Sequence, residues 1–135
     1  MTHAVLLLST LLCTALPAQD ISGRWTTIDD NTGRKRSVVE IDISQGVATG
    51  RIVDVYDKSK ADKVCTKCPD DRKDRPIVGL QIIRGMRPDG DEWTDGTILD
   101  PETGKIYDCK LWSEDGALKV RGYVAFFFRT QTWVR

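Results

Sequence analysis

Short alternating segments separated by turn residues are the feature that most constrains the fold of this chain. In residues 36–44, Val39, Ile41 and Ile43 are separated by single acidic residues. A period of two is typical of a strand with one buried face. Comparable segments recur along the chain, with turn signals such as D-D-N-T-G and D-P-E-T-G between them. The eight expected strands are 22–28, 36–44, 47–56, 77–86, 92–99, 105–112, 117–124 and 130–135.

This spacing predicts an all-β protein, because no segment carries a convincing amphipathic helix pattern. Turns every 8–12 residues favour an antiparallel sandwich or barrel. Sequential hairpins favour an up-and-down meander, and closing it removes the exposed edges that promote aggregation. We therefore expect a single antiparallel up-and-down β-barrel of about eight strands. A barrel of that size is either filled by its side chains or holds one small ligand.

The N-terminus does not read as part of this fold. Residues 4–12 form an apolar run of signal-peptide length, too short to span a bilayer as a helix. We expect a signal peptide at 1–18, with cleavage after Ala18 or, as the alternative, after Ala15. The barrel domain is then 19–135, and the protein is periplasmic or secreted. Lipidation of Cys13 is disfavoured, because a large leucine precedes it.

Charge and residue content exclude several functions. Lys+Arg and Asp+Glu both total 20, so no general attraction to nucleic acid is expected. Cleavage would remove His3, the one histidine, which excludes the usual Ser-His-Asp and Cys-His arrangements. No phosphate-binding or nucleophile-elbow motif is present. We predict a non-enzymatic protein without a metal or another cofactor, and the sequence does not determine its oligomeric state.

The segment V-C-T-K-C at 64–68 lies in a charged connection between two expected strands. A structural zinc site needs four Cys or His ligands, which a cleaved chain lacks. A redox C-x-x-C motif usually opens a helix in an α/β fold. Export makes a disulfide the default. The candidates are Cys65, Cys68 and Cys109. A Cys65–Cys68 bond is favoured narrowly over a bond from either cysteine to Cys109.

Several segments together resemble DUF2147, a bacterial family of small exported proteins of unknown function. The matching stretches are G-R-W-T-T-I-D-D-N-T-G-R-K-R-S-V-V-E-I at 23–41, C-T-K-C at 65–68, R-P-I-V-G-L at 75–80, D-G-T-I-L-D-P-E-T-G-K-I-Y at 95–107, L-K-V-R-G-Y at 118–123 and T-Q-T-W-V-R at 130–135. The resemblance implies an exported lipocalin-like β-barrel. It implies no activity and no catalytic residues.

The first expected strand carries a second likeness, since Gly23-x-Trp25 resembles the G-x-W that opens lipocalin barrels. In those barrels the indole closes one end, and an arginine from a late strand lies across it. We expect Arg135 to take that part, with Arg121 and Arg129 as rivals. Such a cation–π contact contributes about 0.5–2 kcal/mol.

Binding of a small apolar, fatty-acid-like ligand in or at the mouth of the barrel is the function favoured by these features. The aromatic residues expected to contact such a ligand are Trp93, Tyr107, Phe126 and Phe128. The rival hypothesis is a structural or interaction module of the cell envelope, with a filled barrel and a protein partner.

Overall fold

The computed structural model describes residues 9–12 and 20–135. Apart from 9–12, the expected signal peptide lies outside the described residues. Within them, one short 3₁₀ helix, η1 (Lys58–Lys60), accompanies eight strands, and no helix is long and apolar enough to cross a membrane. The strands are β1 (Gly23–Ile28), β2 (Lys35–Ser44), β3 (Val47–Val55), β4 (Gln81–Asp89), β5 (Glu92–Leu99), β6 (Ile106–Glu114), β7 (Ala117–Val124) and β8 (Phe127–Trp133).

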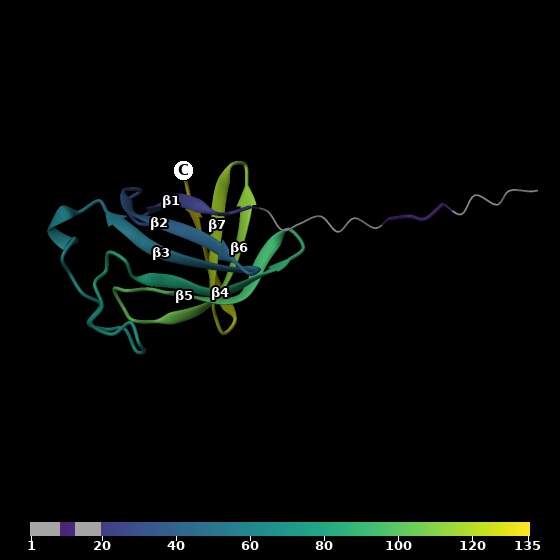
Figure 1. The fold of residues 1–135 in the computed structure, drawn as a ribbon. Coiled ribbons are helices and arrows are strands. Elements are labelled where there is room, and N and C mark those ends of the chain that lie inside the picture. The colour runs from purple at the N-terminus through teal and green to yellow at the C-terminus, as the bar shows by residue number, and fades with distance from the viewer. Residues whose placement is uncertain (1–8, 13–19) are drawn as a thin grey trace, which may run out of the picture.

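The strands form one antiparallel sheet in the order of the sequence, from β1 to β8. In Figure 1, β6–β8 cross β1–β5 steeply, as expected for a strongly coiled sheet. The two edge strands meet where Thr26 and Val134 exchange backbone hydrogen bonds of 2.6 and 3.0 Å. The predicted all-β, up-and-down barrel is thus confirmed, and it is nearly closed.

Two strands differ most from their predicted bounds. The expected strand 77–86 is observed as β4, which starts later, at Gln81. The residues before Gln81 still belong to the preceding loop, in which the backbone N–H of Gly79 donates to the carbonyl of Ile52. The strand then continues through Pro88, predicted as a turn residue. Pairing with β3 has ended at Met86, so the missing N–H of Pro88 leaves no partner unsatisfied. Expected strand 130–135 begins earlier, at Phe127.

Apolar side chains fill the barrel at the end where β2–β3, β4–β5 and β6–β7 turn. Alternate residues of each strand point inward, so the buried positions follow the period of two. Trp25 and Trp133 are the largest of the fully buried side chains. The core at this end also includes Val39, Ile41, Ala48, Ile83, Met86, Trp93, Leu111 and Leu118.

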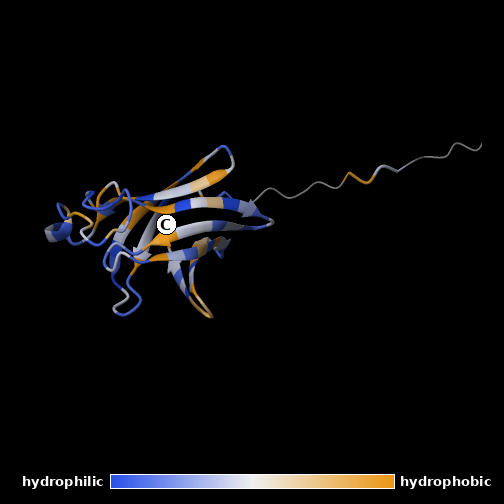
Figure 2. Ribbon diagram, turned by 90° about the horizontal axis from the view of Figure 1, so that it is seen from below, coloured by the Kyte–Doolittle hydropathy of each residue, from blue (hydrophilic) through white to orange (hydrophobic). Residues whose placement is uncertain are grey.

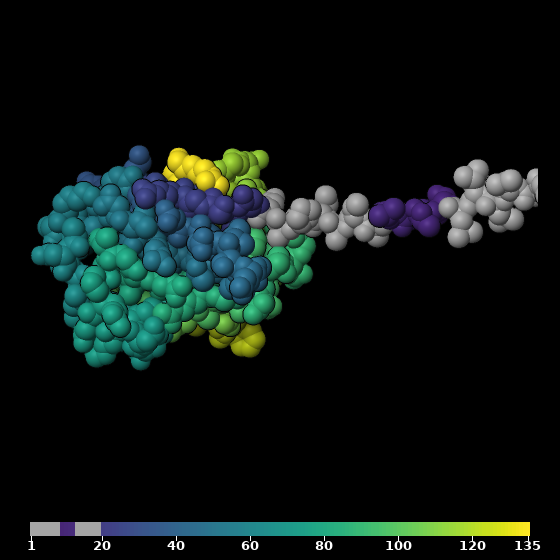
Figure 3. Space-filling model, in the orientation of Figure 1, coloured from purple at the N-terminus to yellow at the C-terminus, as the bar shows by residue number. Residues whose placement is uncertain are grey.

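The connection between β3 and β4, residues 56–80, packs against the barrel at the other end. Arg72 is only 4% exposed, donates to the carbonyl of Gln81 and pairs with Asp70 at 2.7 Å. The carbonyl of Lys67 lies so close to Gly104 that a Cβ there would be 1.9 Å from it. This connection therefore docks on the β5–β6 turn, and Figure 3 shows it as the teal region of the surface.

Candidate ligand cavity

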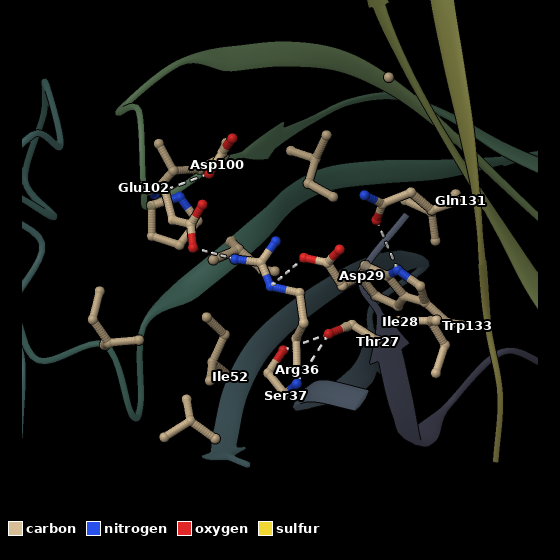
Figure 4. Close-up of a pocket in the computed structure, with 18 of the residues that line it drawn as sticks. Thr27, Ile28, Asp29, Arg36, Ser37, Ile52, Asp100, Glu102, Gln131 and Trp133 are labelled. Atoms are coloured by element: carbon tan, nitrogen blue, oxygen red, sulfur yellow. Dashed lines mark hydrogen bonds and ion pairs between the residues drawn. The ribbon is translucent and has the colours of Figure 1, made fainter. Parts of the chain in front are cut away.

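A cavity of about 760 Å³ opens at the end of the barrel where β1–β2, β3–β4, β5–β6 and β7–β8 connect. Drug-sized ligand sites span about 300–1,000 Å³, so this volume is ample for one small molecule. The barrel is therefore half filled: apolar residues pack one end, and the other end is open. Figure 4 shows side chains of several strands converging on this space.

The inner wall of the cavity is mainly apolar. Its few polar groups satisfy one another: the hydroxyls of Thr27 and Ser37 are 2.7 Å apart, and the indole N–H of Trp133 donates to Gln131 at 3.1 Å. Such pairing lowers the cost of placing hydrocarbon against them. Apolar wall residues include Ile52, Val55, Ile82, Ile98, Leu99 and Val120.

The rim of the cavity is crossed by an ion-pair network centred on Arg36 of β2. Its guanidinium lies 3.8 Å from Asp29 and pairs with Glu102 of the β5–β6 turn (Figure 4). The backbone N–H groups of Thr32 and Asn31 donate to Asp29 and hold the pKa of its carboxyl below the ordinary value. The network joins two sides of the opening and keeps Arg36 at the entrance.

Three lysines on the same rim make no salt bridge within the described part of the chain. They are Lys35, which lies 5.9 Å from the ring of Tyr56, and Lys60 and Lys63 of the long connection. The residues that line the cavity include six basic side chains (Arg34, Lys35, Arg36, Lys60, Lys63 and Arg129) and four acidic ones (Asp29, Asp57, Asp100 and Glu102), so the entrance carries a net positive charge that favours an anion. The cavity is thus apolar inside and partly cationic at its mouth.

The closed end of the barrel holds the three residues expected to form a plug. The Arg135 guanidinium lies 4.0 Å from the centroid of the Trp25 ring and donates to the carbonyl of Ser22. Gly23 has a φ of 104°, and a Cβ there would be 3.0 Å from the guanidinium. The rivals lie elsewhere: Arg121 stacks on Trp112 and Phe128, and Arg129 pairs with Asp30.

Residues 23–135 match the family described as "Uncharacterized protein conserved in bacteria (DUF2147)". The chain belongs to the DUF2147 family. Among curated proteins, no sequence match was found. Protein HP1028 from the human pathogen Helicobacter pylori, which is described as belonging to the lipocalin family, has a similar structure with a TM-score of 0.75. The match has 20% identity and covers 86% of this chain and 82% of that chain, so it shows a shared fold alone.

Only two of the four aromatic residues expected to contact a ligand line the cavity of this DUF2147 chain. These two residues are Tyr107 and Phe128. Trp93 does not, because it follows the β4–β5 turn at the filled end and is buried in the core. Phe126 does not either, because it occupies the β7–β8 turn and faces solvent.

Phe127, which was not among the residues expected to contact a ligand, is the phenylalanine on the inner face of β8. The register pairs it with Val124, and both line the cavity. Counting back in twos from buried Trp133 reaches Gln131, Arg129 and then Phe127, so the signal was present in the sequence. Phe128 pairs with Tyr123 on the outer face, where their rings lie 6.1 Å apart, and only borders the rim.

The narrowly favoured disulfide prediction for this DUF2147 chain is confirmed. Cys65 and Cys68 form a disulfide inside the long connection. Cys109 is free and buried on β6, and burial raises the pKa of its thiol to about 12. Within the described part of the chain, no cluster of three or more Cys, His, Asp or Glu residues is arranged to hold a metal.

Proposed function

We propose that this DUF2147 protein is an exported, non-enzymatic binder of a small apolar ligand with an anionic end, such as a fatty acid. The observation that carries the proposal is the cavity of about 760 Å³, whose apolar wall is reached through a cationic rim. The hydrocarbon would lie against Ile52, Ile98 and Val120. The carboxylate would lie near Lys35, Lys60 and Lys63, where it remains partly hydrated.

Transfer energies support this orientation of the ligand. Each buried methylene contributes about 0.8 kcal/mol, so an acyl chain gains most of its affinity in the apolar interior. A carboxylate placed there would have to be desolvated without a partner, at large cost. At the rim it meets ammonium groups and water instead. The proposal thus predicts that a fatty acid binds more tightly than the matching alcohol.

Displacement of a fluorescent apolar probe by fatty acid tests the proposal, with a cavity-filling variant as the decisive comparison. Gly122 lines the cavity, and a Cβ there would meet Tyr107 at an ordinary 3.5 Å. We expect Gly122→Phe to fold and to occupy the space with its ring. Probe binding should then fall by about tenfold or more, since the displaced apolar contacts are worth over 1.4 kcal/mol.

Lys119→Phe is the matched control, because Lys119 alternates to the outer face of the same strand. Its probe affinity should equal that of the unchanged protein. If Gly122→Phe bound the probe as tightly as Lys119→Phe, the cavity would not be the binding site. Absence of probe binding to the unchanged protein would contradict the proposed function itself.

The rival function, a cell-envelope interaction module with a filled barrel, is supported less well. Its premise was an interior closed by side chains, whereas the barrel has an open half. The exposed aromatic residues of β8 are compatible with a protein partner.

A further inference from the structure

The tip of the β7–β8 hairpin exposes a run of large apolar side chains. Val124, Phe126, Phe127 and Phe128 are 52, 98, 79 and 60% exposed. The hairpin tip is the orange loop at the lower edge of Figure 2, and it is the olive-yellow patch at the lower edge of Figure 3. Contiguous apolar surface of this kind marks a contact with another apolar body.

The charges of the same hairpin all have one sign. Residues Ala117–Trp133 include Lys119, Arg121 and Arg129 but no Asp or Glu. The Arg121 guanidinium lies 4.4 Å from the ring centroid of Phe128 and 4.8 Å from that of Trp112. No carboxylate pairs with Arg121 in the described chain, whereas Arg129 pairs with Asp30 at 2.9 Å.

The spacing of aromatic rings and cations along the hairpin fits a lipid–water interface. The register places Arg129 two residues and Arg121 three residues behind the Val124–Phe127 pair that closes the turn, so at about 3.3 Å per residue they lie about 7 and about 10 Å behind that pair. Apolar side chains of interfacial segments enter about 5–10 Å into the headgroup region. With Phe126 at that depth, the two guanidinium groups would lie at or just above the lipid phosphates, which they contact favourably.

We propose that the β7–β8 tip inserts into the surface of an anionic lipid bilayer, led by Phe126 and anchored by Arg121 and Arg129. Val124 and Phe127 also line the cavity, so insertion places its entrance beside the lipid. The inference goes beyond ligand binding and can fail separately from it, because the tip would enter a bilayer whether or not the cavity is occupied.

Quenching of a tryptophan placed at the tip tests the insertion locally. In Phe126→Trp, emission beyond that of the four native tryptophans reports on position 126 alone. The residue lies in a solvent-exposed turn, so the variant should fold. With vesicles of phosphatidylcholine and phosphatidylglycerol brominated near the headgroup end of the acyl chains, we expect the added emission to shift to the blue and to be quenched.

Tyr56→Trp is the control, because Tyr56 is an exposed aromatic residue at the end of β3, on another side of the rim. Its added emission should be unaffected by the vesicles. Equal quenching in both variants, or none in Phe126→Trp, would overturn the proposal. So would a blue shift in Phe126→Trp without vesicles that accompanies self-association, since the tip would then bind a second copy.

Co-sedimentation with vesicles measures the charge requirement and the contribution of Phe126. The full chain should bind mixed phosphatidylcholine–phosphatidylglycerol vesicles more strongly than pure phosphatidylcholine, and the difference should shrink as salt rises. Phe126→Ser should lower the partition coefficient by about tenfold, while Tyr56→Ser leaves it unchanged. The N-terminal segment is identical in all variants, so its contribution cancels. Equal binding by Phe126→Ser and Tyr56→Ser would contradict insertion of the tip.

Discussion

At the scale of single residues, Trp25, Gly23 and Arg135 form one packed cluster at the closed end of the barrel. The indole is buried, and its N–H donates to the carbonyl of Ile21 at 2.9 Å. The guanidinium covers its face at 4.0 Å, and a side chain larger than hydrogen at position 23 would crowd it. Three residues from two ends of the chain thus close the barrel where β1 and β8 barely pair.

Removing the guanidinium should destabilise the fold measurably. We expect Arg135→Ala to lower the free energy of unfolding by about 0.5–2 kcal/mol, the usual range of a cation–π contact. Arg129→Ala, which breaks the exposed pair with Asp30, should cost about 0–1 kcal/mol. Urea unfolding of both variants compares them. Equal stability of Arg135→Ala and the unchanged protein would argue against a plug.

Cys109 should be unreactive in the folded protein. Burial raises the pKa of its thiol to about 12, so almost no thiolate is present at pH 8, and the thiolate is the reactive form. We expect the peptide that carries Cys109 to be alkylated by iodoacetamide only after denaturation, as peptide mapping by mass spectrometry would show. Rapid alkylation under native conditions would mean that β6 is not buried as described.

The sequence predicted the residues of the closed end and two residues of the cavity, Tyr107 and Phe128, but not the ion-pair network at the mouth. The G-x-W triplet is a local pattern, and its likeness to lipocalin barrels predicted an arginine from a late strand across the indole. Arg36 and Glu102 are 66 residues apart and meet across the opening, which depends on the coiling of the whole sheet. Phe127 was missed for a different reason: the last strand was expected to start at residue 130, so its phase was never extended to the phenylalanines.

At the scale of elements, the connection 56–80 is built as a docked loop and not as a reactive site. The Cys65–Cys68 disulfide, buried Arg72 and the contact of Lys67 with Gly104 all fix its conformation. The structure places Lys60 and Lys63 of this charged segment on the rim. The docking partner could not be read from the sequence, because glycine at 104 also suits an ordinary turn.

Substituting two glycines with similar backbone angles distinguishes the docking contact of the long connection from backbone strain in a turn. Gly104 and Gly116 have φ of 74° and 78°, but a Cβ would meet the carbonyl of Lys67 only at Gly104. Gly116→Ala should cost about 1–2 kcal/mol from backbone strain alone. Gly104→Ala should cost about 1–3 kcal/mol more, as expected for overpacking. Equal losses in thermal or urea unfolding would show that the loop does not dock on the β5–β6 turn.

Acid should weaken the anchor of the loop. Hydrogen bonds from the Arg72 side chain hold the pKa of Asp70 well below its ordinary value near 3.8. A carboxyl whose pKa is lowered on folding stabilises the folded state above its unfolded pKa, and this stabilisation is lost as pH falls through the lowered value. Asp70→Asn should therefore be less stable than the unchanged protein at pH 6, and the difference should shrink below about pH 4.

Thermal unfolding against pH measures this difference, and Asp42→Asn is its control, because Asp42 is exposed on β2. That variant should follow the unchanged protein across the range. A stability difference for Asp70→Asn that stayed constant down to pH 2 would contradict the linkage to Arg72.

At the scale of the whole molecule, a barrel filled at one end and open at the other is the basis of the functional proposal. The fold class followed from period-two strands and regular turns, which are local properties of the sequence. Whether the interior was filled did not follow, because apolar residues that pack a core and apolar residues that line a cavity have the same pattern. The volume depends on how far the strands flare, and β1 and β8 join through a single bridge near the closed end.

Native mass spectrometry of the protein purified without detergent, followed by addition of a fatty acid, tests the central claim most directly. The account predicts a complex of one fatty acid per chain, formed by the unchanged protein and by Lys119→Phe and strongly reduced in Gly122→Phe. A chain that stays unliganded with excess fatty acid would contradict it, and so would a complex that forms equally in all three proteins.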